Sequence, residues 1–457
     1  PLRRILDYYK EPEYFSQILK IALPITLQNF VFSSLNMASV VMIGQKGDVA
    51  VAAVGLAGQI FFLLNLVLFG LGSGTGIFTA QLWGKGDIAN IRKVLGLSLR
   101  LSLGAALLFF LASQFFAAQV LGIYSTDQRV IEVGAEYLRI FSWGFFFFAI
   151  TFGYVFILRS MGNVRLPVVA SVISLIISAV LTYGLVFGKL GLPEYGVNGA
   201  AIAVIIARVI ECAILLGGIY GQKNSTAAAT LTELLFFDWK FAWRIMKPVI
   251  PVALNEIFWS FGITTYNIIY ARMGTESIAA MNIFSTIDNL AFVFFIGLGN
   301  ATAIIVGNKI GSREEQSAYK YAGRSIGLAM SLGVVVGGIV LLLRNPVLSL
   351  YNVTPKVIEY SYQIMTIAAL AIWLRASNMV IIIGTLRSGG DTVYSLVLDG
   401  FVIWLVGVPL AALGAFYFML PIQWVYLLVL SEELTKFIFG LRRYFSHKWI
   451  NNLTHVV

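Results

Sequence analysis

Four charged residues lie deep inside long apolar runs of the sequence, where ionised groups are rare. They are Glu256, Asp288, Arg375 and Asp399. Glu256 follows Asn255 in the stretch VALNEIFWS, in which every other side chain but the last is apolar. An ionised group near the centre of a membrane helix costs about 2.5 to 3.5 kcal/mol on insertion scales, so such groups face a partner or a water-filled cavity. We therefore interpret the four as a cation-coupling site.

Three acids and one base leave the chemistry of this site open between two ions. Arg375 either neutralises one acid as a buried pair or takes part in coupling itself. In both cases the three acids outnumber the single base, so at least one carboxylate has no counter-charge among these four residues. Burial and nearby like charge raise the pKa of a carboxyl, which suits it to bind and release a proton near neutral pH. The alternative is Na⁺, held by carboxylates together with amide oxygens. The amides in question are Asn255, Asn282, Asn289 and Asn378.

Three further features of the apolar runs have a structural or a functional interpretation. Trp259 stands about one helical turn from Glu256 and is a candidate substrate contact. Arg208 and Glu211 are three residues apart and are interpreted as an intrahelical ion pair. Gly70, Gly74, Gly297 and Gly299 predict close helix packing.

Membrane-spanning helices must hold these residues. The 457-residue chain is 59% hydrophobic and 12% charged, with a mean hydropathy of +0.85, which excludes a soluble domain. Apolar runs of about 20 to 30 residues predict helices rather than the short alternating strands of a barrel. Twelve spans are predicted, at residues 15–43, 50–81, 93–121, 130–158, 166–187, 196–220, 242–271, 277–308, 318–343, 357–386, 392–418 and 421–441.

The chain contains an internal repeat. A shift of 227 positions aligns residues 24–84 with 251–311 without a gap and with fourteen identities, and a shift of 228 places Leu158-Arg159-Ser160 on Leu386-Arg387-Ser388. Six spans per copy give both copies the same orientation, an arrangement typical of transporters. We predict an N-terminal bundle at 1–220, a cytoplasmic linker at 221–240 and a C-terminal bundle at 241–457.

The repeat also serves as a control, because a residue needed only for packing should often be matched in the other copy. Glu256 falls opposite Asn29, Asp288 opposite Phe61, Asp399 opposite Ser171 and Arg375 opposite Phe147. All four charges belong to the second copy. We therefore expect ion coupling in the C-terminal bundle, from charges confined to that half.

Several classes of function are excluded or disfavoured. Cys212 is the only cysteine and the two histidines, His447 and His455, lie in the tail, so neither a thiolate cluster nor a histidine metal site is predicted, and no cofactor. An intramembrane enzyme would need a nucleophile and base within the spans. A passive channel would need charges ringing a pore. The net charge of +10 is dispersed at helix ends, which does not suit nucleic acid.

The sidedness of the basic residues predicts the topology. The ends that contain Lys85, Arg92, Lys309 and Arg442 are richer in Lys and Arg than the opposite loops, so this side and both termini are expected in the cytoplasm. The leader, residues 1–15, resembles an amphipathic cytoplasmic segment. We expect a multi-pass protein of the cell inner (plasma) membrane that works as a monomer in the lipid bilayer.

Three stretches in order along the chain resemble the multidrug and toxic compound extrusion family. They are NMASVVMIGQKGDVAVAAVG at 36–55, NATAIIVGNKIGSREE at 300–315 and GTLRSGGDT at 384–392. The resemblance covers nearly the whole chain and implies an all-α membrane fold with twelve helices in two parallel six-helix repeats that form a V-shaped pair of bundles. It also implies export of small organic, cationic or amphipathic compounds in exchange for H⁺ or Na⁺.

The chain departs from the family pattern at the acids. Many members carry an Asp in the first span where this sequence has Ser39, and some use an Asp in the fifth span where it has Thr182. Glu256 loosely matches a Glu of the seventh span, while a tenth-span Asp is missing near Arg375. The prediction is an antiporter working by alternating access with its coupling acids in the C-terminal half. The alternative is a flippase of lipid-linked sugars or another lipid-like substrate.

Overall fold

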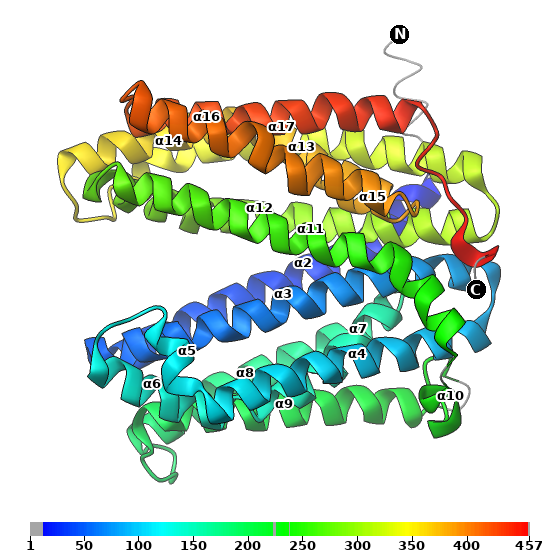
Figure 1. Ribbon diagram of the computed structural model, residues 1–457, viewed down its shortest axis with the longest axis horizontal. Coiled ribbons are helices and arrows are strands. Elements are labelled where there is room, and N and C mark those ends of the chain that lie inside the picture. Colours follow the sequence, from blue (N-terminus) through cyan, green and yellow to red (C-terminus); the bar gives the residue numbers. More distant parts are fainter. Residues whose placement is uncertain (1–11, 223–224, 237, 456–457) are drawn as a thin grey trace. The chain divides into compact units, whose positions relative to one another are not determined.

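The computed structural model describes residues 12–222, 225–236 and 238–455, and this part of the chain is helical without strands (Figure 1). The α-helices are α2 (Pro12–Gly44), α3 (Asp48–Lys85), α4 (Ile88–Phe115), α5 (Ala117–Gly122), α6 (Gln128–Phe141), α7 (Gly144–Ser160), α8 (Arg165–Phe187), α9 (Gly196–Tyr220), α10 (Leu231–Leu235), α11 (Trp239–Arg272), α12 (Thr275–Gly311), α13 (Glu315–Leu348), α14 (Pro355–Met379), α15 (Thr392–Ser395), α16 (Val408–Ala412) and α17 (Ile422–Phe445). The first eleven residues of the predicted leader lie outside the described residues, as do residues 223, 224 and 237 of the predicted linker.

The helices have the lengths that a bilayer requires. Among the described residues, nine are long and apolar enough to cross a membrane, and α6 and α7, bent by 51°, form a tenth span as a pair. The helices α11 and α17, of 34 and 24 residues, are long enough to span but are not among these nine. With them, each of the twelve predicted spans corresponds to a helix, and the predicted all-α membrane fold is confirmed.

The chain forms two compact units. Of the described residues, one contains 12–26, 80–85 and 246–455, and the other contains 27–79 and those of 86–245. In the first, which we call the C-terminal unit, α12 packs against α13 and α14, and α14 against α17 (Figure 1). In the second, the N-terminal unit, α9 packs against α6, α7 and α8, and α4 against α7. The predicted boundaries at residues 220 and 241 stay a prediction.

Local sequence signals explain where several helices begin. The Asp87 carboxylate accepts a hydrogen bond from the Asn90 backbone at the start of α4, and Asp127 caps α6 in the same way. Thr230 and Glu233 form a reciprocal capping box on α10. Gly297 of α12 lies so close to Thr26 that a Cβ would overlap its hydroxyl, which confirms the packing role predicted for that glycine.

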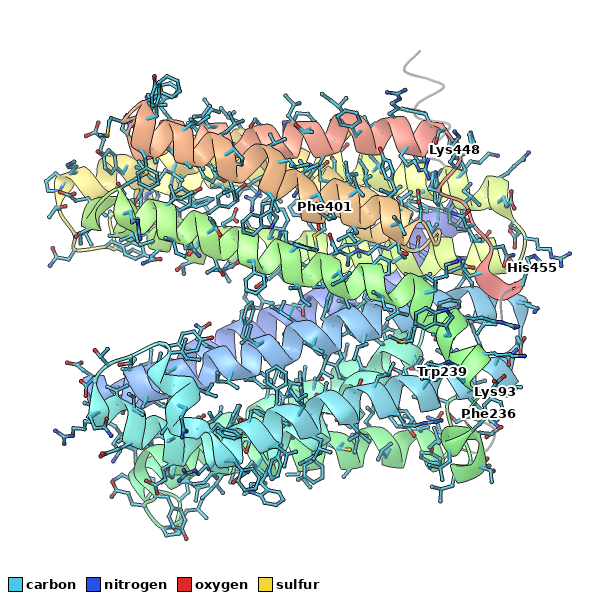
Figure 2. All side chains as sticks on the ribbon, viewed as in Figure 1. Lys93, Phe236, Trp239, Phe401, Lys448 and His455 are labelled. Carbon is cyan, nitrogen blue, oxygen red and sulfur yellow. The ribbon has the colours of Figure 1, made fainter. Side chains whose placement is uncertain are left out.

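The connection between α9 and α11 is fastened to the end of α4. Arg92 pairs with Glu233 at 3.1 Å and donates to the backbone oxygen of Thr226. Lys93 lies over the ring of Phe236, with 4.6 Å from Nζ to the ring centre (Figure 2). Polar contacts of α4 thus hold the described part of the predicted linker in place.

The last helices of the C-terminal unit depart from regular α-helix. They contain π-helical turns at η1 (Val380–Arg387), η2 (Leu396–Phe401), η3 (Ile403–Gly407) and η4 (Leu413–Tyr417), and the tail ends in a 3₁₀ turn, η5 (Leu453–His455). Such π-turns are rare and occur often at functional sites. Arg387 ends η1 and Asp399 lies in η2, so the distortion coincides with charged residues.

Candidate functional site

The C-terminal unit contains a cluster of charged side chains that we call the acid-rich centre. Its members are Glu256 of α11, Arg387 of η1, Asp399 of η2, and Glu432, Glu433 and Lys436 of α17. Arg387 and Lys436 are 3% and 2% exposed, and Glu256 and Glu432 are 8% and 4% exposed. Four carboxyl groups share two cations, so the fully ionised centre would carry a net charge of −2 in a buried environment.

Lys436 is the hub of the centre. Its Nζ lies 2.9 Å from Asp399 Oδ1 and 3.1 Å from Glu432 Oε1, and 3.9 Å from Glu433 Oε1. Glu432 stands one helical turn before Lys436, so this pair lies on one face of α17. The opposite oxygen of Glu432 accepts a hydrogen bond from the Tyr266 hydroxyl of α11. Lys436 therefore compensates three carboxylates at once.

Arg387 connects α11 with η2. Its Nη1 donates to Glu256 Oε1 at 2.7 Å, its Nη2 lies 3.9 Å from Asp399 Oδ2, and its Nε donates to Ser395 Oγ at 3.3 Å. Asp399 is thus shared between Arg387 and Lys436. Protonation of Glu256 would weaken its contact with Arg387, and protonation of Asp399 would weaken its contacts with Arg387 and Lys436. Each of these contacts joins two different helical segments.

Two buried amides complete the centre. Asn255 donates to Asp399 Oδ2 at 2.9 Å, and Asn378 of α14 donates to Glu433 Oε2 at 2.6 Å. The side-chain oxygens of both amides have no hydrogen-bond partner within the described residues. Two acceptor oxygens are therefore available beside the carboxylates.

Asp288 and Arg375 form a separate pair between α12 and α14. Arg375 Nη1 and Nη2 donate to the two Asp288 oxygens at 2.6 and 2.8 Å, the two-pronged geometry that makes such pairs strong. The guanidinium also lies 4.6 Å from the centre of the Phe292 ring. This pair has no net charge, in contrast to the acid-rich centre.

The N-terminal unit contains a second cluster, which we call the base-rich centre. Its members are Gln28 of α2, Arg159 of α7, Ser171 of α8, and Arg208 and Glu211 of α9. Arg159 donates to Gln28, Gln28 donates to Ser171, and Ser171 donates to Glu211, over distances of 2.6, 2.8 and 2.6 Å. Arg208 closes the chain by donating to Glu211 at 2.7 Å.

The charge of this second centre is opposite in sign. Two guanidiniums meet one carboxylate, that of Glu211, which is 3% exposed. Arg208 also lies over the Phe148 ring at 4.8 Å. The predicted Arg208–Glu211 ion pair is confirmed. The expectation that buried charge is confined to the second half of the chain is wrong, because Glu211 and its partners lie inside the first.

The residues predicted for the site divide into three groups. Asn255, Glu256, Asp399 and Asn378 belong to the acid-rich centre. Asp288 and Arg375 lie in their own pair. Asn282, Asn289 and Trp259 are exposed on the surface of the C-terminal unit. The coupling and contact roles proposed for all nine stay predictions.

Sequence reasoning missed Arg387, Lys436, Glu432 and Glu433. The predicted span 357–386 ends one residue before Arg387, whereas in the structure η1 continues the helix to Arg387 and buries its side chain. Glu432 and Lys436 are four residues apart in the last span, a spacing that places both on one face of a helix. This spacing is the sequence signal from which the ion pair on α17 could be predicted.

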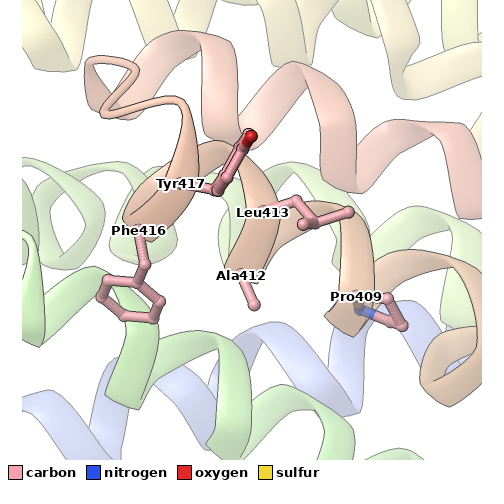
Figure 3. A pocket seen from close by; sticks show the side chains of 5 residues that line it. All are labelled: Pro409, Ala412, Leu413, Phe416 and Tyr417. Atoms are coloured by element: carbon pink, nitrogen blue, oxygen red, sulfur yellow. The ribbon is translucent and has the colours of Figure 1, made fainter.

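One hollow of about 650 Å³ lies at the outer surface of α16 and η4, apart from the charged centre (Figure 3). Its lining consists of Pro409, Ala412, Leu413, Phe416 and Tyr417. Because these side chains are apolar except for one hydroxyl, the hollow offers no group for ion coupling.

The sequence of this chain is similar to those of a known protein family. The MatE family model matches residues 24–184 and 251–413, which is more than half of the chain. The chain belongs to the MATE family. The two matches begin 227 positions apart, at the offset of the internal repeat.

Several MATE relatives cover nearly the whole chain. A probable multidrug resistance protein NorM of Thermotoga maritima is 25% identical over 96% of this chain and 94% of its own length. The probable multidrug resistance protein YoeA of Bacillus subtilis is 24% identical, over 91% and 90%. The Vibrio cholerae MATE transporter VcmN in its bent form superimposes with a TM-score of 0.86 at 17% identity, over 95% and 97%.

Membership of the MATE family makes this chain a multi-pass membrane transporter of small molecules rather than an enzyme. MATE transporters use ion gradients instead of cofactors. The acid-rich centre is therefore the first place to look for ion coupling.

Proposed function

We propose that this MATE transporter is a secondary active antiporter that exports small organic, cationic or amphipathic compounds in exchange for H⁺ or Na⁺. The observation that supports the proposal is the excess of carboxyl groups in the acid-rich centre, four against two cations. A bound H⁺ or Na⁺ lowers the net charge of this buried cluster. Coupling by alternating access requires that the ion bind the two conformations unequally.

Glu256 and Asp399 are the groups best placed to respond to the ion. Glu256 joins α11 to η1 through Arg387, and Asp399 joins η2 to α17 through Lys436. Loss of charge on either acid weakens an attraction between two helices. The centre thereby provides a physical link between ion binding and helix position.

The contacts favour the proton over Na⁺ as the coupling ion. A proton adds to a carboxyl oxygen without displacing its neighbours. A sodium ion beside Glu256 or Asp399 would instead lie next to Arg387 and Lys436, which repel it. The free oxygens of Asn255 and Asn378 are the features that support Na⁺ as the second candidate.

Export of a lipid-linked sugar or another lipid-like substrate is the rival function. Phosphate recognition would use Arg or Lys inside the helix bundles. Arg387 and Lys436 are buried and Arg159 and Arg375 are half-buried, and these four are cations of that kind in the described part of the chain. A lipid-scrambling measurement in liposomes separates the two functions.

We further propose that both termini are cytoplasmic, that the transporter resides in the inner membrane and that it works as a monomer without nucleic acid. Basic side chains at the ends of α3, α4 and α17 support this orientation. Labelling of a cysteine introduced near His455 in sealed cells tests it.

The central experiment measures efflux of a fluorescent cation from proteoliposomes under a pH gradient and a Na⁺ gradient, imposed separately. We expect the pH gradient to drive efflux and Glu256→Gln to reduce it by more than tenfold. Glu359→Gln, an exposed acid on α14, is the matched control and should keep normal efflux.

The same assay addresses the Asp288–Arg375 pair. Asp288→Asn reduces efflux if Asp288 takes part in coupling, and a retained rate assigns coupling to the acid-rich centre alone. Normal gradient-driven efflux by both Glu256→Gln and Asp288→Asn would refute the proposed coupling groups.

A further inference from the structure

The two charged centres occupy equivalent positions in the two repeats. At the shift of 227 Gln28 corresponds to Asn255, and at the shift of 228 Ser171 corresponds to Asp399. In each copy the amide nitrogen donates to the side-chain oxygen of the second residue, at 2.8 Å in the first and 2.9 Å in the second. The same hydrogen bond thus appears twice, so the centres can be compared atom by atom.

The basic residues also correspond. Arg159 is the repeat equivalent of Arg387, and Arg208 falls opposite Lys436 at the same shift. Lys436 binds Asp399 directly, whereas Arg208 reaches Ser171 through the carboxylate of Glu211. Each centre therefore places two cations at matching positions and differs in its acids.

The two centres differ most in the acids around Arg387 and around its repeat equivalent, Arg159. Arg387 has two carboxylates near it, Glu256 at 2.7 Å and Asp399 at 3.9 Å. The positions of those acids are taken by Asn29 and Ser171 in the first repeat. Arg159 consequently has an equivalent location without either counter-ion.

Arg159 is poorly compensated where it lies. Within the described part of the chain it forms one hydrogen bond, to Gln28, and no ion pair, and its buried Nε has no partner. An interior guanidinium with one neutral partner is costly, and such residues in membrane proteins usually meet a ligand or a counter-charge. Guanidinium binds carboxylate and phosphate with two parallel hydrogen bonds.

We propose that Arg159 binds an oxyanion of an amphipathic organic ligand, a carboxylate or a phosphate, in the place that Glu256 and Asp399 take beside Arg387. The inference rests on the proposed export of small organic compounds and adds a preference for molecules with an acidic group beside an apolar or cationic body. Gln28, which donates to Ser171, accepts a hydrogen bond from the Arg159 guanidinium, and Glu211 pairs with Arg208, so that the net positive charge of the centre falls on Arg159.

The experiment is equilibrium binding to the full-length protein in phosphatidylcholine nanodiscs, followed by fluorescence polarisation without any ion gradient. The two probes are rhodamine 110, which has a free carboxylate, and rhodamine 123, its methyl ester. We expect Arg159→Gln to weaken binding of rhodamine 110 by at least tenfold and of rhodamine 123 by less than twofold. Arg165→Gln, an exposed arginine at the start of α8, is the control and should leave both affinities unchanged.

Two further variants separate an anion site from a structural role. Arg159→Lys keeps the positive charge but cannot donate two parallel hydrogen bonds to one oxyanion, so rhodamine 110 should bind with an intermediate affinity. Asn29→Glu leaves Arg159 in place and supplies the acid that the second repeat has, so it should also weaken rhodamine 110 selectively. If Arg159→Gln does not fold, the selective effect of Asn29→Glu carries the test.

The lipid composition of the nanodiscs distinguishes a lipid phosphate from a soluble carboxylate as the oxyanion that Arg159 binds. If phosphatidylglycerol in the nanodiscs weakens rhodamine 110 binding to the wild type but not to Arg159→Gln, a lipid headgroup competes for the site. If it has no effect, the site selects the soluble carboxylate. Equal loss of both probes in Arg159→Gln and in Asn29→Glu, or an unchanged affinity in both variants, overturns the proposal. Because no gradient is used, failure here is distinct from failure of ion coupling.

Discussion

The acid-rich and base-rich centres show how one scaffold can hold opposite charge in two copies of a helix bundle. In the C-terminal unit, Arg387 and Lys436 are surrounded by four carboxyl groups. In the base-rich centre of the N-terminal unit, Glu211 is the one carboxylate and pairs with Arg208, whereas Arg159 contacts the neutral Gln28. The cations stay at matching positions, while the acids around them differ. The number of acids around these cations therefore sets the sign of the net charge in each centre.

The backbone differs between the centres as well. Arg387 and Asp399 lie in π-helical turns, whereas the corresponding segments α7 and α8 are regular α-helix. Gly407, the last residue of η3, packs so closely that a Cβ there would overlap the Tyr266 hydroxyl and Glu432. The acid-rich centre thus combines π-helical turns, which are wider than an α-helix, with close packing at Gly407. This geometry is consistent with the proposal that contacts in the centre change when an ion binds.

Removing the hub of the acid-rich centre should have the largest effect. Lys436→Met leaves Asp399, Glu432 and Glu433 without their shared cation, and breaking a buried ion pair costs about 3 to 5 kcal/mol. We expect a lowered apparent melting temperature, measured by tryptophan fluorescence in detergent, and loss of gradient-driven efflux. Lys436→Arg keeps the charge and should be milder. A melting temperature equal to that of the wild type in Lys436→Met would show that the carboxylates do not depend on this cation.

The mirror-image change in the base-rich centre should have a smaller effect of a different kind. Glu211→Gln leaves Arg208 and Arg159 without a carboxylate, and Arg208 keeps its contact with Phe148, so we expect a loss of about 2 kcal/mol. Sulfate should recover part of the lost melting temperature in Glu211→Gln by binding the uncompensated cations. It should do nothing for Lys436→Met, in which the excess charge is negative. Equal responses to sulfate would contradict opposite charge in the two centres.

The ion pair between Arg92 and Glu233 lies outside the membrane helices, and its loss should have the smallest effect on stability. Its effect can be compared with those of the two buried centres. The hydrogen bond from the Thr230 backbone and the contact with Arg92 lower the pKa of Glu233 below its ordinary value. The stabilisation is therefore present above the unfolded pKa, about 4.3, and is lost as the pH falls through the lower folded pKa. We expect Glu233→Gln to cost about 0.5 to 1 kcal/mol at pH 7, as for a helix cap. The difference in melting temperature from the wild type should shrink in acid, and a constant difference would rule out the charge as its cause.

Most of the fold was predictable because the bilayer imposes a simple rule on the sequence. A helix that crosses hydrocarbon must be long and apolar, and a duplicated bundle leaves a repeated pattern of Gly and Pro, such as Pro24 and Pro251. The twelve spans and the family followed from these features. The bend between α6 and α7 and the π-turns of the last spans did not, since neither changes the hydropathy of the segment.

The candidate site was only partly predictable. Glu256 and Asp399 were found because a carboxylate far from a helix end is exceptional in any apolar run. Asn282, Asn289 and Trp259 were proposed for the same site but lie on exposed surfaces, because hydropathy does not specify the direction in which one residue of an apolar helix points. Arg387 and Arg159 were noticed only as part of a repeated motif.

The amino-acid sequence by itself determined that this chain forms two related bundles of membrane helices and that charged groups inside them require partners, since both conclusions depend on the cost of polar groups in hydrocarbon. Only the tertiary structure decided which partners those are. Asp399 and Lys436 lie on different helices, and so do Arg159 and Gln28. Their meeting depends on helix rotation and packing, which no stretch of apolar residues specifies. The sign of each centre is therefore a property of the folded bundle.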